Sequence, residues 1–242
     1  MEVHAHTHTP RKKWTHYIWE FLMLFLAVFC GFLAEYKLEQ TIEHHKELEY
    51  IESMMEDLQN DTAKLSRLDI ELGRIATSID TILLYYDDMP KGANPILFRN
   101  IRAIYGYPIF INSDRTIQQL KSSGGMRLIK NKKAANDIID YDGYVRNYEN
   151  NGLYVQRFWE YLTFQRINII DQPMLDNDLK TAEGINTAKN YLFDNDPVVL
   201  RKLKSAIYEL RLYHTNTIRD NLALKEKAVE LMQVLKKEYH LE

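Results

Sequence analysis

Alternate histidines near the start of the chain have the residue type and spacing for binding a metal ion. His4, His6 and His8 stand in a basic tail, and imidazole nitrogen is a ligand of Zn²⁺, Ni²⁺ and Cu²⁺. Three such ligands without a carboxylate or thiolate make only an open site. The pattern predicts metal binding in vitro, and the alternative is a solvated tail whose charge changes near neutral pH.

Glu20 is a second candidate, because it is a carboxylate at the head of an apolar stretch from Phe21 to Ala34. A charge inside a bilayer is costly unless it lies near headgroups, is neutralised or is paired. In one interpretation Glu20 lies at the cytoplasmic interface beside Lys12, Lys13 and His16. In the other it faces a partner helix, as in the stator subunits of proton-driven motors, a likeness of architecture alone.

A third candidate is a polar layer in an apolar stripe near the C-terminus, formed by His214, Thr217 and Asn221. Buried polar residues in helix seams set register or oligomeric state at a cost in stability. The alternative is a ligand pocket outside the cytoplasm. Its lining would be three tyrosines, Tyr144, Tyr148 and Tyr154.

Catalytic motifs are absent from the sequence. Glu43, His44, His45 and Glu47 cluster together, but di-iron sites in bundles use Glu-x-x-His pairs, which these histidines do not complete. There is no H-E-x-x-H, G-x-S-x-G, Walker or G-x-G-x-x-G pattern. We therefore predict a protein that is not an enzyme and that needs no cofactor.

Composition indicates a folded domain with no affinity for nucleic acid. The chain has 242 residues, 45% of them hydrophobic, with a net charge of −3, so it can bury a core but offers no basic field. Cys30 is the single cysteine and lies in the apolar stretch, which excludes disulfides within the chain. Phe29 before it is too large for a lipid-attachment motif.

The apolar stretch predicts a membrane anchor. Aromatic and apolar residues extend it to residues 17–36, a length that can cross the ~30 Å hydrocarbon layer. No small-residue cleavage pattern follows it. Basic residues precede the stretch and acidic residues follow it, so we predict a cytoplasmic tail (1–16), a transmembrane helix (17–36) and a periplasmic domain (37–242) in a bacterial inner membrane.

Apolar residues at alternating spacings of three and four predict an all-α fold. The first long helix is expected to leave the membrane without a break and to end near Asp88, with Thr62 at a stammer in its seam. A second is expected over 131–170, and a third after the capping sequence Asn195, Asp196 and Pro197. These three would form an elongated antiparallel bundle.

Two shorter helices are expected between the first and second long helices. Asn94 and Pro95 open one that extends to about residue 105, and Ser113 or Asp114 caps another that ends before Gly125. We expect both at the end of the bundle far from the membrane.

The segment over 116–141, taken with the anchor, resembles a group of uncharacterised bacterial single-pass inner-membrane proteins. The matching pattern is T-x-x-x-L-x-x-[ST]-G-x-x-x-L-I-K-N, and it is carried here by Thr116, Leu120, Ser123, Gly124, Leu128, Ile129, Lys130 and Asn131. The resemblance implies an envelope location and no known activity. From the residues alone, the segment predicts a corner between two helices, with a glycine C-cap and an asparagine N-cap.

Together these features predict a single-pass envelope protein that acts through helix surfaces, as a scaffold or as an accessory subunit. Its expected partners are the lipid bilayer and either further copies of itself or a membrane-protein complex. The alternatives are a ligand-sensing accessory subunit and an ion-coupled motor subunit that uses Glu20.

Overall fold

The computed structural model describes residues 14–91, 94–104, 106–181, 184–185 and 189–241. In these ranges the chain forms six α-helices and two short 3-10 helices, which confirms the predicted all-α fold. The chain divides into two compact units, residues 1–49 and residues 50–242. Helix α1 (Trp14–Leu84) begins in the first unit and ends in the second.

The first unit is the apolar beginning of helix α1. Its large side chains from Phe21 to Leu33 are exposed, and three of them stack along one face, with ring centroids 6.3 Å apart for Phe21 and Phe25 and 5.9 Å apart for Phe25 and Phe29. By length and composition, this helix can cross a membrane. A membrane anchor and a signal sequence both meet that criterion.

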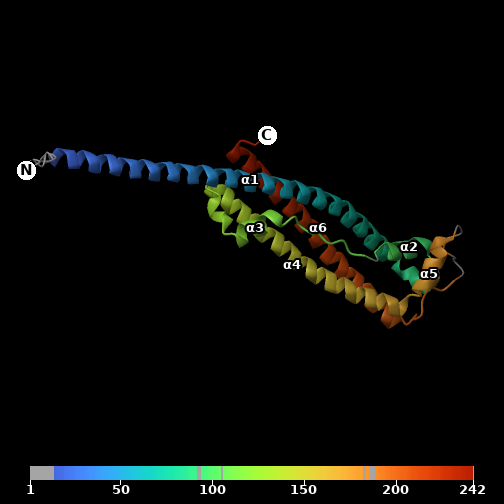
Figure 1. Ribbon diagram of the computed structural model, residues 1–242. Coiled ribbons are helices and arrows are strands. Elements are labelled where there is room, and N and C mark those ends of the chain that lie inside the picture. Colours follow the sequence, from blue (N-terminus) through green and yellow to red (C-terminus); the bar gives the residue numbers. More distant parts are fainter. Residues whose placement is uncertain (1–13, 92–93, 105, 182–183, 186–188, 242) are drawn as a thin grey trace, which may run out of the picture. The chain divides into compact units, whose positions relative to one another are not determined.

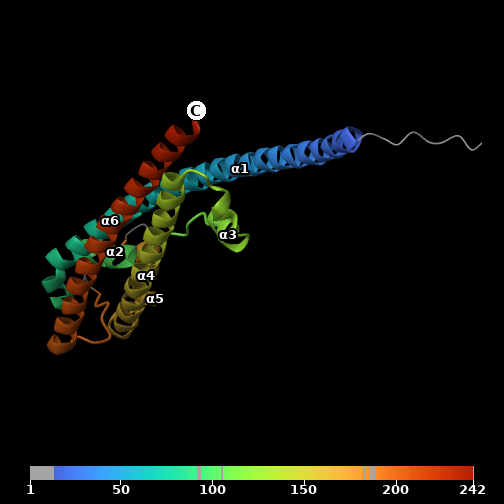
Figure 2. The ribbon, with the colours of Figure 1, turned by 90° about the vertical axis from the view of Figure 1, so that its left-hand side faces the viewer.

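The second unit is built on the last part of α1 together with α4 (Lys132–Ile169) and α6 (Pro197–Tyr239). Figures 1 and 2 show α4 and α6 side by side and antiparallel. Helix α6 runs antiparallel to both α1 and α4, which run in the same direction as each other. The reason is that the segment between α2 and α3 returns along α1, where the Lys64 ammonium donates to the Ile111 carbonyl at 2.9 Å.

The seam of α1 differs from the predicted one at two points, Met54 and Asp61. Met54 is 3% exposed and Asp61 is 1% exposed, whereas Thr62 is only half-buried. With Met54 and Asp61 in the seam, the buried positions alternate by three and four from Ile51 to Tyr86, so the stammer predicted at Thr62 is absent. A charged residue in the core could not be recognised from a search for apolar residues.

Side-chain caps fix the starts of α4 and α6, as the sequence predicts. The Asn131 side chain accepts from the Ala134 amide at 3.0 Å, and the Asp196 carboxylate accepts from the Val198 amide at 2.6 Å. These oxygens satisfy amides that have no partner within a helix.

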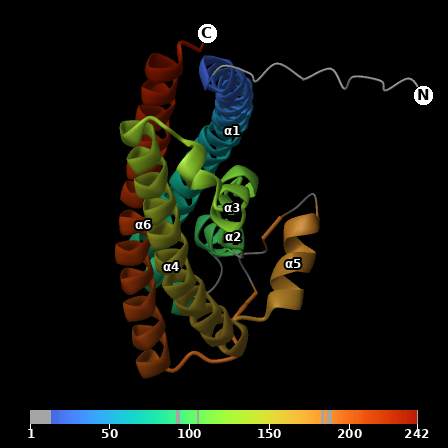
Figure 3. The same ribbon diagram turned by 60° about the vertical axis from the view of Figure 1, so that its left-hand side comes forward.

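The shorter elements lie in two places. After η1 (Tyr86–Lys91), helix α2 (Pro95–Ala103) packs near the end of α1, and its N-cap is the predicted Asn94. Helix α3 (Arg115–Ser122) packs instead beside residues 51–72 of α1, so the prediction that both short helices share one end is wrong. A further helix that was not predicted, α5 (Gln172–Lys180), follows α4 (Figure 3).

The core of the second unit consists of two apolar clusters. One contains the end of α1, α2, the end of α4, α5 and the beginning of α6. The other contains residues 51–72 of α1, α3, the beginning of α4 and the end of α6. Along α6, the first cluster ends at Leu210 and the second begins at Leu224, so the predicted polar layer lies where the two clusters meet.

Candidate functional site

The polar layer is built from α6 side chains that bind the backbone of α1. His214 is 1% exposed, and its Nε2 lies 2.8 Å from the Leu72 carbonyl oxygen. Because a carbonyl oxygen only accepts, Nε2 carries the hydrogen. Its ring meets the Tyr107 ring edge to face, with centroids 6.0 Å apart.

Asn221 completes the layer two turns further along α6 and is fully buried. Its side-chain amide donates to the Leu65 carbonyl at 3.2 Å and to the Asp69 carboxylate at 2.6 Å. The Tyr148 hydroxyl donates to the Asn221 side-chain oxygen at 3.4 Å. One asparagine therefore joins all three long helices.

These bonds hold α1 and α6 in one register. A third bond runs the other way, from the Tyr86 hydroxyl of η1 to the Leu200 carbonyl of α6 at 2.7 Å. Each step back along the chain, from Tyr86 to Leu72 to Leu65, is matched by an equal step forward along α6, from Leu200 to His214 to Asn221. The contacts support the register interpretation of the polar layer, since a slip by one turn would break all three bonds.

Thr217 and the tyrosines proposed as a pocket lining take no part in these bonds between α1 and α6, apart from Tyr148. Thr217 is half-buried, and its hydroxyl donates to the Tyr213 carbonyl of its own helix. Of the three tyrosines proposed as a pocket lining, Tyr148 is in the core, Tyr144 is 48% exposed and Tyr154 is 67% exposed. The structure does not gather them around one cavity.

The environment of His214 opposes its protonation. Burial lowers the pKa of the imidazole below its usual 6.5, and the hydrogen bond to Leu72 offsets only part of this effect. Within the described part of the chain, Nδ1 has no hydrogen-bond partner. A proton added there would be buried and unpaired.

We expect acid to weaken the second unit through His214. A depressed pKa in the folded state means that this contribution to stability is complete above the unfolded pKa and is lost as the pH falls below ~6.5. Between about pH 7.5 and about pH 5.5, the free energy of unfolding should fall by about 1 kcal/mol more than in His214→Gln. Urea titrations followed by circular dichroism measure the free energy of unfolding of the unchanged chain and of His214→Gln at each pH.

His45→Gln is the matched control, because His45 is exposed. It should keep the pH dependence of the unchanged chain. An unchanged pH dependence in His214→Gln would show that the imidazole does not resist protonation.

Two buried aspartates that the sequence analysis missed hold helix α3. The Asp61 carboxylate accepts from the Ser113 amide at 2.6 Å and from the Tyr141 hydroxyl at 2.9 Å. The Asp57 carboxylate accepts from the Thr116 amide at 2.9 Å. Carboxylates from α1 therefore cap α3, whereas Asp114, one of the two predicted caps, makes no side-chain capping bond. The available signal was a pair of carboxylates one helical turn apart in an apolar seam.

The segment that carries the family resemblance folds as the predicted corner. Helix α3 ends at Ser122, Gly124 takes the left-handed conformation (φ 67°), and a 3-10 turn, η2 (Gly125–Leu128), leads to the Asn131 cap. Only glycine adopts that conformation without strain. The pattern thus has a local structural explanation.

The remaining candidates lie at or near the N-terminus. In the first unit, His16 Nε2 lies 2.9 Å from a Glu20 carboxylate oxygen, one turn away on the same helix. His44 lies 3.5 Å from Glu47. No group of three potential metal ligands occurs among the described residues. His4, His6 and His8 lie outside those residues, so their metal binding stays a prediction.

Comparisons of the chain with protein-family models, with curated proteins and with solved structures find no match. The resemblance of the segment over 116–141 therefore stays a prediction.

Proposed function

We propose that this protein is a single-pass membrane protein of the bacterial envelope, without enzymatic activity, that acts as a scaffold or accessory subunit. Its N-terminus lies in the cytoplasm, residues 17–36 cross the inner membrane, and residues 37–242 form a helical domain in the periplasm. Binding takes place on the helix surfaces of that domain.

The exposed apolar beginning of α1 carries this proposal. Its side chains between Phe21 and Leu33 have no protein core around them, and transfer of such a surface from water into lipid is favourable. Arg11, Lys12 and Lys13 precede it, and Glu35, Glu39 and Glu43 follow it. This asymmetry is the one that keeps a preceding tail in the cytoplasm.

The interior of the second unit favours a structural role over a ligand-sensing one. The buried polar groups of His214, Asn221 and Asp61 hydrogen-bond to other parts of the bundle. Groups that hold helices in register in this way stabilise one arrangement of the bundle. A rigid bundle presents fixed surfaces, which is what a docking protein needs.

Fractionation tests the anchor. The full chain is expected in the membrane pellet after an alkaline wash, and deletion of residues 17–36 is expected to move it to the soluble fraction. Deletion of residues 2–10, which removes the histidine tail, should leave it in the pellet. A full chain that the wash extracts would contradict the anchor.

Two further measurements test the orientation and the role. Protease added from the periplasmic side should digest residues 37–242. Purification in a gentle detergent should retain a protein partner or a further copy of the chain. A single chain without any protein partner would contradict the scaffold role.

A further inference from the structure

A groove on the surface of the second unit lies between α1 and the segment that follows α2. It has a volume of about 720 Å³. One wall is the stretch of α1 from Glu71 to Ser78, and the other is formed by Ala103 and residues 106–108. A volume of this order is typical of sites that bind small molecules.

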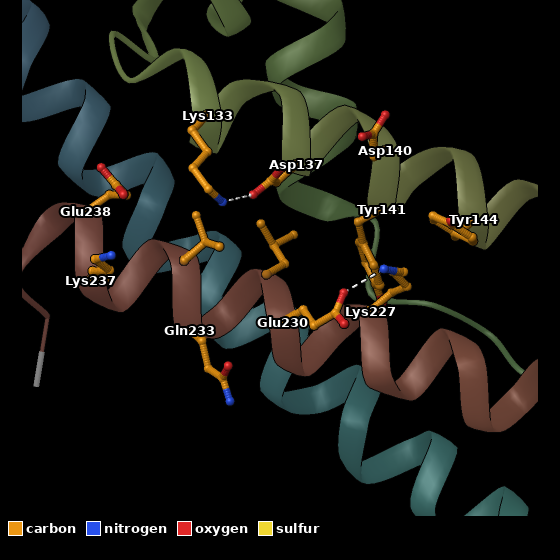
Figure 4. Close-up of a pocket in the computed structure, with 12 residues that line it drawn as sticks. Lys133, Asp137, Asp140, Tyr141, Tyr144, Lys227, Glu230, Gln233, Lys237 and Glu238 are labelled. Carbon is orange, nitrogen blue, oxygen red and sulfur yellow. Dashed lines mark hydrogen bonds and ion pairs between the residues drawn. The ribbon is translucent and has the colours of Figure 1, made fainter.

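Charged side chains in a different groove, between α4 and α6, pair with one another along each helix (Figure 4). Lys133 lies 2.7 Å from Asp137 on α4, and Lys227 lies 2.6 Å from Glu230 on α6. Each pair joins residues one turn apart, a spacing that favours such pairs. These charges are satisfied by neighbours on their own helix, so they need no ligand.

Glu71 and Arg74 also lie one turn apart, but they do not pair. Both are exposed and line the groove beside α1. Within the part of the chain that the structure describes, neither makes an ion pair or a hydrogen bond. One wall of the groove therefore presents a carboxylate and a guanidinium whose Cβ atoms are about 5 to 6 Å apart. Opposite charges at this spacing complement a small zwitterion.

Ser78 adds a buried hydroxyl to the same wall, one turn beyond Arg74. The residue is 8% exposed and lines the groove, and its hydroxyl has no hydrogen-bond partner among the described residues. A buried polar group without a partner is costly, so this hydroxyl favours a ligand that brings an acceptor. Arg74 and Ser78 can donate to the same carboxylate.

We propose that this groove binds a dipeptide, with the ligand carboxylate against Arg74 and Ser78 and the ligand ammonium group against Glu71. The two charged ends of an extended dipeptide are about 6 Å apart, which matches the spacing of Glu71 and Arg74. In a free amino acid the two charges are closer together. Such binding goes beyond the proposed scaffold role and does not depend on it.

The rest of the groove suits small apolar side chains on the ligand. Ile75 lines the α1 wall between the charged residues and Ser78, and Ala103 and Pro108 line the opposite wall. None of these three side chains carries a polar group. Apolar side chains of the dipeptide would therefore lose water on binding, which is favourable.

Tyr107 connects the groove to the polar layer. It lines the groove, and its ring centroid lies 6.0 Å from that of His214 and 5.0 Å from that of Trp159. A ligand that packs against Tyr107 thus contacts the neighbour of the histidine that holds α6 on α1. Because a ligand that binds only the folded chain stabilises it, the dipeptide should raise the midpoint of thermal unfolding.

The test is equilibrium dialysis of the full chain, in a mild detergent, against radiolabelled L-alanyl-L-alanine. We expect saturable binding with a dissociation constant below about 1 mM. Blocking either end of the dipeptide should weaken binding at least tenfold. The amide form lacks the charge that faces Arg74, and the N-acetyl form lacks the charge that faces Glu71.

Two substitutions assign these charges to their partners. In Arg74→Gln, the dipeptide and its amide should bind equally weakly, and in Glu71→Gln the dipeptide and its N-acetyl form should do so. Arg67→Gln is the control, because Arg67 is exposed on α1 and does not line the groove. It should bind the dipeptide like the unchanged chain. Circular dichroism checks that each variant is folded.

A folded full chain that shows no saturable binding would overturn the proposal. Blocked forms that bind as well as the dipeptide would also overturn it, and so would Arg74→Gln that binds like the unchanged chain or a control that is weakened equally. Retention in the membrane and co-purification of a partner are scored separately. They test the scaffold role, which stands or falls without the dipeptide.

Discussion

Replacing Asp61 by alanine is expected to lower the free energy of unfolding by about 3 to 5 kcal/mol. The carboxylate is 1% exposed and accepts from the Ser113 amide and the Tyr141 hydroxyl. Its removal leaves the buried Tyr141 hydroxyl and the half-buried Ser113 amide without this acceptor, and an unsatisfied buried donor costs about 1 to 3 kcal/mol. Lys64, which lies 3.9 Å away, would also lose its nearest carboxylate.

Urea unfolding of the full chain in detergent, followed by circular dichroism, measures this loss. Hydrogen exchange should locate it, with faster exchange over residues 113–122. Thr62→Ala is the matched control on the neighbouring residue, and we expect it to change stability by less than about 0.5 kcal/mol. A larger cost for Thr62→Ala than for Asp61→Ala would favour the seam predicted from the sequence.

Replacing Asn221 by alanine is expected to lower the free energy of unfolding by about 2 to 4 kcal/mol. The residue is fully buried, and its amide bonds to α1 while its oxygen accepts from Tyr148 of α4. Alanine would remove the donor to the Leu65 carbonyl and the Asp69 carboxylate, leave the Tyr148 hydroxyl without this acceptor, and open a small cavity. The same urea titration measures the loss.

Thr217→Ala tests whether all three residues of the predicted polar layer contribute to the free energy of unfolding. Thr217 is half-buried and bonds to its own helix, so its loss should cost less than about 0.5 kcal/mol. Equal costs for Thr217→Ala and Asn221→Ala would mean that the three residues act as a unit, as the sequence spacing alone implied.

The long helices could be predicted because their signals are local. The caps Asn131 and Asp196 stand where the sequence places them, and α4 and α6 begin immediately after them. The apolar stripe of α6 also predicted that His214 and Asn221 would be buried. Such features depend on residues within two turns of one another, which a single sequence displays.

The missed features depend on contacts between distant residues. Asp57 and Asp61 become buried because the amides of Thr116 and Ser113 donate to them. The sequence around these aspartates does not indicate which distant amides they bind. Local patterns predict elements, whereas the pairing of polar groups depends on the tertiary fold.

The three bonds that hold α6 on α1 and η1 have a consequence for synthesis of the chain. They join residues 114, 142 and 156 positions apart in sequence, so they cannot form until the last helix has emerged. Until then, the apolar side chains of α1 that α6 will cover stay open to water and to other chains. A translating ribosome adds about 5 to 20 residues per second, so this exposure lasts for seconds. Products that stop before residue 200 should therefore aggregate or be degraded, and a chaperone that shields α1 would raise the yield of complete protein.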